Sequence, residues 1–530
     1  MGSVQTWAVM VCLALSGGAV IAAKAPKEPQ KDRAEADALF TQSNVLRLRL
    51  EIAKPDLDSL RKNPRKYVKV TLREGDAVFE DVGVHLKGSA GSFRQVDDKP
   101  GLTFNMAAFE ASSRFHGLRK FHLNNSVQDG SCLSEFVSGE LFRAAGVPAA
   151  RAGLALVELN GRKLGLYVFL ESMDRDFLAR DFHNTKGNLY GQAGGCEITD
   201  AIERMEGRGP LDRADLKGLA AAINEPNPAK RWERVQKALD VDRFLSFMAL
   251  EVMLCHWDGY TFARHNYRVY HDLDTDRMVF LPHDLDQLMQ DSNVPIVPGV
   301  NGWVSQTMVR TPETRDRYRA RFGAIFTNLF VVSALTNRIN QRVAQVMPVL
   351  KAADAGLAQN FQNNCGNLKS RIVNRAQALE RQFNLPGPLK FENNVAKLKG
   401  WKQVVSQGNA NCDETKLDGK PVLHIKCETG GGIASWRANV TLDQGRYRFS
   451  GQAKCAGVVP DEGGAGGGGG LRDKLSRRNN KLSGDANWTL LEHEFEEGGD
   501  NRQVELVCDL RAKQGEIWFD ASSLKLERLK

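Results

Sequence analysis

The chain has 530 residues, of which 42% are hydrophobic and 26% are charged, a composition typical of folded globular domains rather than of disordered or collagen-like chains. This length exceeds one typical hydrophobic core, so we expect two or more domains. The net charge of +8 is small for the length and comes with no DNA- or RNA-binding motif, so a nucleic-acid partner is not expected.

An apolar run, "WAVMVCLALSGGAVIAA", extends from Trp7 to Ala23 and ends in small residues. This pattern predicts a secretory signal peptide over residues 1–25. A membrane anchor is the alternative, but the run is interrupted by Gly17 and Gly18 and is short for a span. No later segment is long and apolar enough to cross a membrane. We therefore expect an exported protein, either secreted, periplasmic or on the cell surface, without an integral membrane segment after cleavage.

Between residues 44 and 106, runs such as "VLRLRLEI", "YVKVTL" and "VGVHLKG" alternate with turn residues and predict β-strands. The following segment, "SCLSEFVSGELFRAAGVP", predicts a helix. Asp129 or Ser131 can cap the start of this helix, and Gly146 with Pro148 ends it.

The segment "ALVELNGRKLGLYVFLE" predicts a β-hairpin, because Asn160-Gly161 suits a two-residue turn with positive φ between alternating strands. Helical patterns dominate from Met173 to Leu254. "YRVYHDLDTDRMVFLP" then predicts two strands around an acidic turn, and further helices follow a loop at 292–303 and run to Phe383.

"NLPGPLKFENN" (384–394) marks a domain boundary. Beyond it, "KPVLHIKCE", "ASWRANVTL", "GRYRFSGQAKC", "NWTLLEHEFE", "RQVELVCDL" and "GEIWFDASSLKLE" predict an antiparallel sandwich or jelly roll. A glycine-rich and basic insert within it, "DEGGAGGGGGLRDKLSRRNNKLSGD", predicts a surface loop. Four cysteines fall here, as two disulfides or as four buried thiols: Cys412, Cys427, Cys455 and Cys508.

The chain carries no GxSxG, HExxH or GxxxxGK[ST] motif, so the usual hydrolase, zinc-protease and P-loop patterns are absent from the sequence. Polar residues instead follow apolar elements: Asp258 follows a helix, Asn266 follows a short loop, and Asp284 and Asp286 follow a strand. A hairpin brings Asp258, Asn266 and Asp284 to one end of the same sheet. Magnesium takes carboxylate and phosphate oxygens, so this set suits phosphoryl transfer.

Plainer interpretations stand beside this one. Asp258, Asp284 and Asp286 suit turn or cap positions as well as a metal site, and Lys87, Lys99 and Glu135 suit the protein surface. The turn acids Asp272, Asp274 and Asp276 suit either a solvated turn or calcium. Four nearby histidines raise a zinc alternative, although no pair has the helical HxxxH spacing: His256, His265, His271 and His283.

Several segments, in this order, resemble the CotH family, the spore coat protein H type of atypical kinase. They are "VGVHLKGSAGSFR", "KPGLTFNM", "FHGLRKFHLNNSVQDGSCLSE", "GVPAARAGLALVELNGRKLGLYVFLESMDRDFL", "WDGYTFARHNYRVY" and "FLPHDLDQLM". The resemblance covers roughly residues 38–385. The C-terminal region lies outside it, and its Trp, Gly and "WFD" pattern is similar to carbohydrate-binding jelly rolls.

The resemblance implies a two-lobed, α+β, atypical kinase-like domain that binds ATP with Mg²⁺ or Mn²⁺. Such a domain phosphorylates Ser or Thr on a secreted or surface protein. Asp284 matches the family's metal-binding Asp, with Asp286 beside it. Asp258 acts in catalysis or in metal coordination, and Asn266 is a further contact to metal or phosphate.

The resemblance also implies the nucleotide-binding residues. The "KGSAGS" turn, with Gly88 and Ser89, covers the phosphates, and Lys87 or Lys99 is the cation over them. Glu135 anchors that lysine as an ion pair, and Glu171 lies near the crossing to the second lobe. The chain departs from the family at His283, where the family usually carries Trp.

The expected organisation is therefore a signal peptide (1–25), a CotH kinase-like domain (38–385), a linker (386–394) and an all-β jelly-roll or sandwich domain (395–530) with a glycan as its expected partner. Two alternatives remain. One is an adhesion protein that keeps the kinase-like fold without turnover, and the other is a metal-dependent hydrolase or nucleotide transferase built on the same carboxylates.

Overall fold

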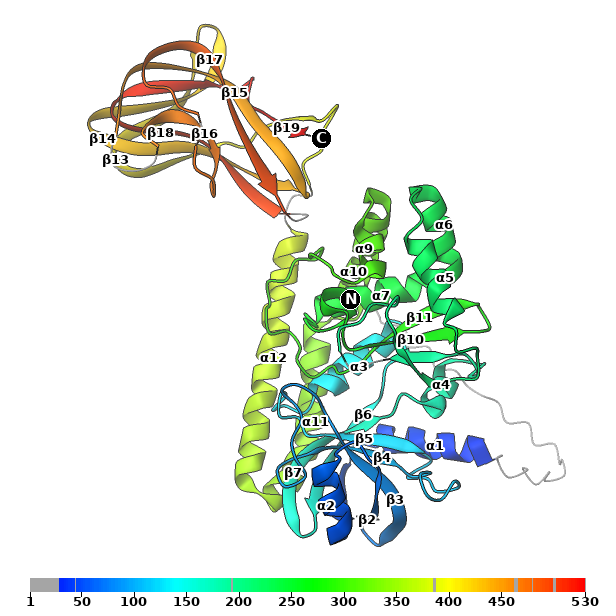
Figure 1. The fold of residues 1–530 in the computed structure, drawn as a ribbon. Helices are drawn as coiled ribbons and strands as arrows, with labels where there is room; N and C mark the ends of the chain where they lie inside the picture. The colour runs from blue at the N-terminus through cyan, green and yellow to red at the C-terminus, as the bar shows by residue number, and fades with distance from the viewer. Residues whose placement is uncertain are drawn as a thin grey trace, which may run out of the picture.

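The structure is a computed structural model that describes residues 28–42, 44–191, 194–384, 388–461, 466–478, 480–498 and 502–529. The expected signal peptide lies outside the described residues, as do residues 386 and 387 of the expected linker. An α+β portion is followed by an all-β portion, which confirms the expected fold class at this level. Figure 1 shows the all-β portion projecting beyond the end of the last helix.

The first part of the α+β portion is a closed barrel in the order β1-β2-β3-β4-β5-β7-β6. A parallel pairing of β1 with β6 closes it, and the other neighbours are antiparallel. Apolar side chains at alternate positions, such as Leu48 and Leu50, fill the interior. The strands are β1 (Val45–Glu51), β2 (Val68–Glu74), β3 (Ala77–Lys87), β4 (Gly101–Asn105), β5 (Lys120–Asn124), β6 (Ala152–Leu159) and β7 (Arg162–Glu171).

The predicted hairpin is confirmed as β6–β7. Asn160 and Gly161 both have positive φ, +49° and +80°, as the two-residue turn requires. The Asn160 amide also donates to the carbonyl of Ile52 at 2.7 Å and accepts its N–H at 2.8 Å. The turn therefore fastens the hairpin to the segment after β1.

The second part is helical and has its own apolar core. The predicted helix after Asp129 is α3, and the strand pair around the acidic turn is β10–β11. Its helices are α3 (Ser134–Ala144), α4 (Arg175–Asp181), α5 (Ala214–Ile223), α6 (Pro228–Ala238), α7 (Val241–Met253), α8 (Tyr260–Ala263), α9 (Trp303–Val309), α10 (Pro312–Asn328), α11 (Val332–Ala353) and α12 (Ala355–Phe383). Two further helices, α1 (Glu28–Thr41) and α2 (Lys54–Lys62), accompany the barrel.

A four-stranded sheet in the order β11-β10-β8-β9 lies within the helical part. Its strands are β8 (Leu189–Gly191), β9 (Glu203–Glu206), β10 (Tyr267–Asp272) and β11 (Arg277–Pro282). Helices dominate Met173–Leu254 as predicted, but no sequence pattern indicated β8 and β9, which are too short to show a strand period. Helix α7 is buried along most of its length and packs against β11.

Among the described residues, no single helix is long and apolar enough to span a membrane. One pair, α10 with α11, passes the length and composition test only when taken together, and it is bent by 53°.

The all-β portion, here called the β domain, is one continuous hydrogen-bonded sheet curled around a core. Its strands are β12 (Val395–Lys397), β13 (Lys402–Leu417), β14 (Lys420–Leu442), β15 (Gly445–Pro460), β16 (Gly468–Asp473), β17 (Gly484–Glu497), β18 (Arg502–Asp520) and β19 (Lys525–Leu529). The prediction of separate short strands is wrong in two places. The expected strands "KPVLHIKCE" and "ASWRANVTL" are one strand, β14, and "RQVELVCDL" continues into the first part of "GEIWFDASSLKLE" as β18.

Glycines allow this continuity. At Gly515, φ is +110° and an added Cβ would lie 2.4 Å from the carbonyl oxygen of Gly457. A register shift between Cys427 and Gly432 bends β14 beside this point. The four cysteines of the β domain are free thiols, so the disulfide alternative is wrong for the described structure.

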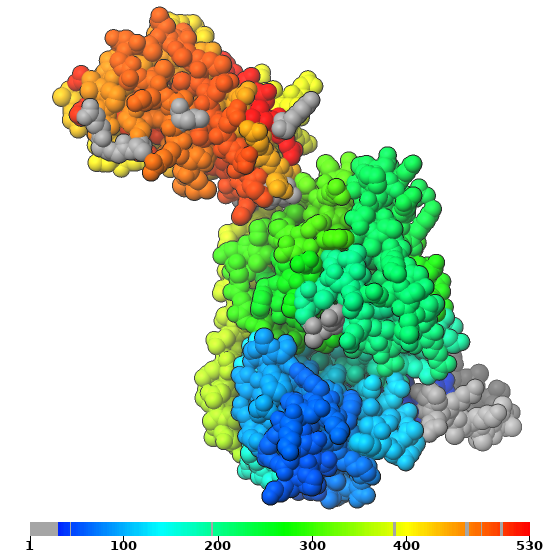
Figure 2. Space-filling view, viewed as in Figure 1, coloured from blue at the N-terminus to red at the C-terminus, as the bar shows by residue number. Residues whose placement is uncertain are grey.

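Helix α12 links the parts of the molecule, since it begins near the barrel and ends where the β domain starts (Figure 1). At the start of α12, Leu357 lies close to Gly165 of β7. Figure 2 shows the β domain standing largely clear of the rest. Arg315 of α10 forms an ion pair with Asp443 of the β domain at 3.3 Å.

Candidate functional site

Most of the predicted site residues meet where the barrel faces the helical part. Lys87 is the last residue of β3, and Glu135 lies in the first turn of α3. The charge of Lys87 interacts with Asp284, Glu135 and Asp286. Residues that lie far apart in the sequence thus share one electrostatic environment.

The base of the β10–β11 hairpin brings the acidic residues together. Tyr267 pairs with Pro282, and the next residue outward on one strand, His283, donates its N–H to the carbonyl of Asn266 on the other at 3.0 Å. Asn266 and Asp284 both have positive φ, +46° and +57°, a conformation that Asn and Asp adopt more readily than most residues. The hairpin therefore places Asp284 beside Asn266, as the sequence predicts.

Asp258 joins this pair from the segment between α7 and α8. Its Oδ2 accepts a hydrogen bond from the Asn266 amide at 2.8 Å, and its Oδ1 lies 3.3 Å from His256 Nε2. That Oδ1 is buried and accepts no hydrogen bond from the described residues. Burial raises the pKa of Asp258, and the neighbouring charge of Asp284 raises it further. A buried carboxylate oxygen in this state is suited to a cation or to a proton.

Lys87 and Glu135 are joined through Asn124 rather than directly. The Lys87 ammonium donates to Asn124 Oδ1, and the Asn124 amide lies 3.5 Å from Glu135 Oε1. The predicted ion pair is thus a bridged arrangement across β3, β5 and α3. Burial lowers the pKa of Lys87, and the nearby carboxylates oppose this effect.

The acids repel one another. Burial, together with Asp284 and Asp286, raises the pKa of Glu135 to about 8. Burial, together with Asp284, Asp129 and Asp258, raises the pKa of Asp286 to about 8. The site therefore holds more potential negative charge than Lys87 can balance.

The turn after Lys87 contains the predicted Gly88 and Ser89. Gly88 has φ +105°, and an added Cβ would lie 3.0 Å from the backbone of Phe93, so the turn is compact. The carbonyl of Ser89 accepts the N–H groups of Ser92 and Phe93. The turn follows directly on the strand end that carries Lys87.

Two predicted residues lie elsewhere. The Lys99 ammonium donates to the carbonyl of Leu166 at 3.0 Å and lies 5.0 Å from the Tyr167 ring centroid. Glu171 forms ion pairs with Arg151 and Arg180. Neither is brought to the acids, and of the two predicted lysines Lys87 is the one that interacts with them.

Arg268 is a site residue that sequence reasoning missed. It is 8% exposed, it contacts His283 Nε2 at 3.1 Å, and its Nε is buried without a hydrogen-bond partner among the described residues. Burial lowers its pKa to about 10, against the opposing charge of Asp284. Gly191 makes room for it, because an added Cβ there would lie 2.3 Å from Arg268 Cδ. The departure from the family pattern at His283, which Arg268 contacts, is the sequence feature that could have indicated this residue.

His256, one of the four histidines of the zinc alternative, is fully buried beside the acids. Its Nε2 lies 3.2 Å from the Asp284 carbonyl oxygen, and its Nδ1 lies 3.6 Å from Glu251. His271 lies apart from this group, between Asp215 at 3.3 Å and Asp276 at 2.9 Å, so the four histidines do not converge.

The acidic turn is held by its own hydrogen bonds. The carboxylate of Asp272 accepts the N–H of Asp274 at 3.2 Å and the hydroxyl of Thr275 at 2.8 Å.

The described residues contain no group of three or more His, Cys, Asp or Glu side chains placed to hold a metal ion. Mg²⁺ needs only one or two protein carboxylates when phosphate oxygens complete its shell. Asp258, Asn266, Asp284 and Asp286 offer hard oxygen donors. Asp258 Oδ1 accepts no hydrogen bond from the described residues, and this oxygen and the mutual repulsion of the acids favour a cation. These residues therefore fit a divalent cation bound together with a polyphosphate.

The α+β portion thus consists of a barrel and a helical part, with the acidic site between them. The family model described as CotH kinase protein matches residues 84–379. The chain belongs to this family.

Two curated relatives illustrate the relationship. The chain is 27% identical over 328 residues to inner spore coat protein H of Bacillus subtilis (strain 168), a match that covers 58% of this chain and 88% of the relative. It is 25% identical over 186 residues to invasin CotH3 of Rhizopus delemar, which covers 31% of each chain. The match thus spans about a third of the invasin's length.

Solved structures with some likeness include TmCBM61 in complex with beta-1,4-galactotriose, at a TM-score of 0.19 and 12% identity over 27% of this chain and 97% of that one. A CBM4 structure has a TM-score of 0.18 and 14% identity over 24% and 86% of the two chains. At these scores no ligand of this chain follows from the likeness.

Proposed function

We propose that the chain is an exported CotH-type kinase that transfers the γ-phosphate of ATP, with Mg²⁺ or Mn²⁺, to Ser or Thr of a secreted or surface protein. The observation that carries this proposal is the meeting of Asp258, Asn266 and Asp284 at one hairpin end, opposite Lys87 of the barrel. Phosphoryl transfer needs this combination of oxygen donors, a base and a cation over the phosphates. The names of the relatives, a spore coat protein and an invasin, support a surface or secreted location.

Each residue has a role in this proposal. Asp284, Asp286 and Asn266 hold the metal, which supplies charge neutralisation to the phosphates when it is bound. Lys87, positioned by Asn124, contacts phosphate oxygens, and the compact turn that contains Gly88 and Ser89 lies over them.

Asp258 accepts the proton of the acceptor hydroxyl as that oxygen bonds to the γ-phosphorus and the bond to the ADP oxygen breaks. The raised pKa of Asp258 makes it a stronger base than an ordinary carboxylate. Arg268 adds a second cation on the side of Asp284.

The test uses the purified full-length chain with γ-labelled ATP, a casein-type acceptor and Mn²⁺ or Mg²⁺. We expect label in protein, and loss of label by a factor of at least about 100 in Asp284→Asn, because a metal contact is removed. Asp274→Asn, in the exposed hairpin turn, is the matched control and keeps its activity. Equal labelling by Asp284→Asn refutes the proposal, and incorporation of α-label instead of γ-label identifies a nucleotide transferase.

A second candidate function is adhesion, in which the kinase-like part does not turn over and the β domain holds a glycan. Trp518 favours it, since this half-buried ring stacks on His424 with ring centroids 5.1 Å apart and planes within 6°. Asp413 and Glu516 hold that histidine from both nitrogens, at 2.8 and 2.9 Å. An aromatic face ringed by polar groups suits a sugar. Binding of a polysaccharide by a chain that incorporates no label supports adhesion over catalysis.

A further inference from the structure

The outer face of the β-domain sheet carries a group of arginines that the proposed kinase site does not use. The register places Ser435 of β14 opposite Asp509 of β18, and it places Arg437 and Arg472 on either side of Val507. The intervening residues of β18 pack into the core, so these side chains point away from it. We call Arg437, Arg472, Arg478, Arg511 and Lys474, with Asp509 and Glu505, the arginine face.

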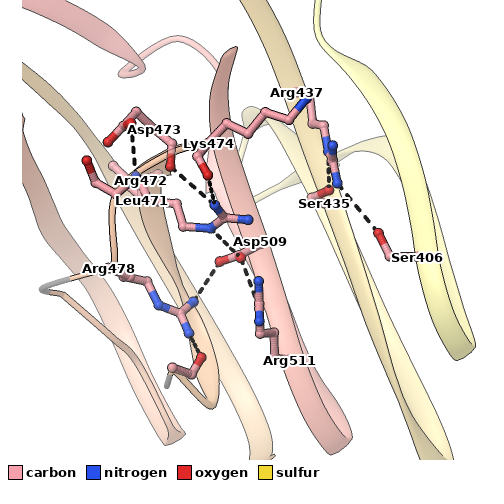
Figure 3. Close-up of polar contacts among 12 residues, drawn as sticks. Ser406, Ser435, Arg437, Leu471, Arg472, Asp473, Lys474, Arg478, Asp509 and Arg511 are labelled. Carbon is pink, nitrogen blue, oxygen red and sulfur yellow. Dashed lines mark hydrogen bonds and ion pairs between the residues drawn. The ribbon is translucent and has the colours of Figure 1, made fainter. Parts of the chain in front are cut away.

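Three guanidinium groups share one carboxylate at its centre. Asp509 is 1% exposed and accepts from Arg478 at 2.7 Å, Arg472 at 3.0 Å and Arg511 at 3.4 Å. Figure 3 shows these three side chains converging on Asp509, with Arg437 on the neighbouring strand. Arg472 and Arg511 lie on strands of the sheet, and Arg478 lies in the segment after β16.

The segment after β16 completes the arginine face. Arg478 crosses Gly470 to reach Asp509, and an added Cβ at Gly470 would lie 2.6 Å from Arg478 Cδ. Arg478 also donates to the carbonyl of Gly468 at 3.1 Å. A residue from beyond the strand is thus locked beside the carboxylate.

Positive charge exceeds negative charge here. The five cationic side chains face two carboxylates. Asp509 binds Arg472, Arg478 and Arg511. Glu505 pairs with the other two cations, Arg437 at 3.2 Å and Lys474 at 3.4 Å. Burial lowers the pKa of Arg478, and the neighbouring Arg511 and Arg472 lower it further, against the opposing charge of Asp509. An excess of partly desolvated charge is costly unless an ion of the opposite sign balances it.

Arg511 is the residue with most capacity left for a ligand. Among the described residues it makes one ion pair, through Nε, and its side chain is 36% exposed. Its two terminal nitrogens are the fork that binds carboxylate or sulfate bidentately. Arg437 reaches the exposed Ser406 hydroxyl at 3.5 Å, which adds a polar group beside it.

We propose that the arginine face binds an acidic polysaccharide through its carboxylate or sulfate groups. This proposal deepens the glycan-binding role given above for the β domain and rests on it. Arg437 and Arg472 stand on strands separated by β18, about 10 Å apart at the usual strand spacing. Cations so spaced contact separate anionic groups along an extended polymer rather than one small anion.

The test measures binding of the full-length chain to three probes at physiological salt: polygalacturonate, dextran sulfate and neutral dextran. The variant is Arg511→Gln, which leaves Asp509 with Arg472 and Arg478, and an unchanged melting curve verifies its fold. Arg446→Gln is the matched control, since Arg446 is an exposed arginine on β15 that pairs with Glu494 and Glu496. Both variants remove one positive charge.

We expect binding to polygalacturonate, dextran sulfate or both, a loss of about tenfold in Arg511→Gln and less than about twofold in Arg446→Gln. The preferred probe identifies a uronate or a sulfate as the recognised group. Equal losses in the two variants, or none in Arg511→Gln, overturn the proposal.

Binding to neutral dextran alone contradicts the proposal of an acidic ligand but keeps the glycan-binding role of the β domain. Binding to none of the three probes contradicts both the acidic ligand and the glycan-binding role. Phosphotransfer is the same in Arg511→Gln as in the unmodified chain under every outcome, so the kinase proposal is tested separately.

Discussion

Replacing Glu135 with Gln should stabilise the protein in the absence of nucleotide while it slows phosphotransfer. Glu135 is 5% exposed, and its carboxyl faces Asp284 and Asp286, which raise its pKa beyond the effect of burial. Gln has the same shape and keeps an oxygen that can accept the N–H of Leu285. The substitution therefore removes the repulsion without opening a cavity.

The magnitude follows from the pKa. A carboxyl whose pKa rises from 4.5 to about 8 on folding costs the folded state about 3 kcal/mol at pH 7. Since Asp284 and Asp286 share the repulsion and Lys87 opposes it, we expect Glu135→Gln to raise the free energy of unfolding by about 1–2 kcal/mol. The melting temperature of the kinase-like part should rise by about 2–4 °C.

The sign of the pH dependence is fixed by the same shift. Because the folded-state pKa lies above the unfolded value, the folded protein binds more protons between pH 4.5 and about 8. Below pH 4.5 the Glu135 carboxyl is protonated in both the folded and the unfolded states and does not destabilise the fold. The stability that it contributes relative to its ionised form is lost as pH rises through the folded-state pKa of about 8. The advantage of Glu135→Gln should be larger at pH 8 than at pH 5.5.

Scanning calorimetry of the nucleotide-free chain at these two pH values measures the effect. Glu140→Gln is the control, because Glu140 lies on the same helix and pairs with Arg338 at the surface. This control should give no gain at either pH. A lower melting temperature in Glu135→Gln, or an equal change at both pH values, would show that the acids do not repel one another in the folded protein.

Three further substitutions test other parts of the structure. Asn124→Leu removes the acceptor that positions Lys87, so the Kd for ATP should rise about tenfold by calorimetric titration, and an unchanged Kd would separate Lys87 from the phosphates. Gly191→Ala places a Cβ 2.3 Å from Arg268 Cδ, so γ-label transfer should fall about tenfold, whereas Gly218→Ala, with no atom within 4 Å, should leave it unchanged. Gly515→Ala should destabilise the β domain by at least about 2 kcal/mol in its own melting transition, well beyond the effect of Gly484→Ala, which has open space around it.

The sequence predicted the fold best where a strong local pattern coincided with a tertiary requirement. Asn160-Gly161 specified its hairpin because its two residues tolerate positive φ, and the β10–β11 hairpin was visible from its apolar runs. The short strands β8 and β9 gave no period to detect. They matter for the site, because Gly191 of β8 makes room for Arg268.

The site itself was predictable as a set of acids but not as a set of cations. Asp258, Asn266 and Asp284 follow apolar elements, so their convergence could be inferred from the hairpin between them. Lys87 ends β3, and Lys99 lies twelve residues later, just before β4. No local sequence pattern predicts that the Lys99 ammonium donates to the carbonyl of Leu166. Side-chain direction at a strand end is set by packing across the barrel, which a single sequence does not encode locally.

In the β domain the sequence misled in a physically informative way. Glycine normally interrupts a strand pattern, so the segments around Gly430 and Gly515 predicted turns between separate strands. In the structure these glycines bend continuous strands that keep their partners on both sides of the bend. The same curvature wraps one sheet around the core, whereas a sandwich encloses its core between two separate sheets.

The charges of the site explain why its acids are tolerated at all. The carboxyl groups of Asp284, Asp286 and Glu135 interact with Lys87, and Asp258 lies beside Asp284. Glu135 and Asp286 have pKa values of about 8. At neutral pH the fold thus keeps part of its negative charge protonated, at a cost in stability. A divalent cation bound between these groups would release those protons. Proton release on adding Mn²⁺ with ATP, measured in buffers of different ionisation enthalpy, should therefore be larger at pH 7 than at pH 9, where the acids are already ionised, and it should shrink in Glu135→Gln. Proton release that does not depend on pH or on Glu135 would mean that the cation does not bind among these acids.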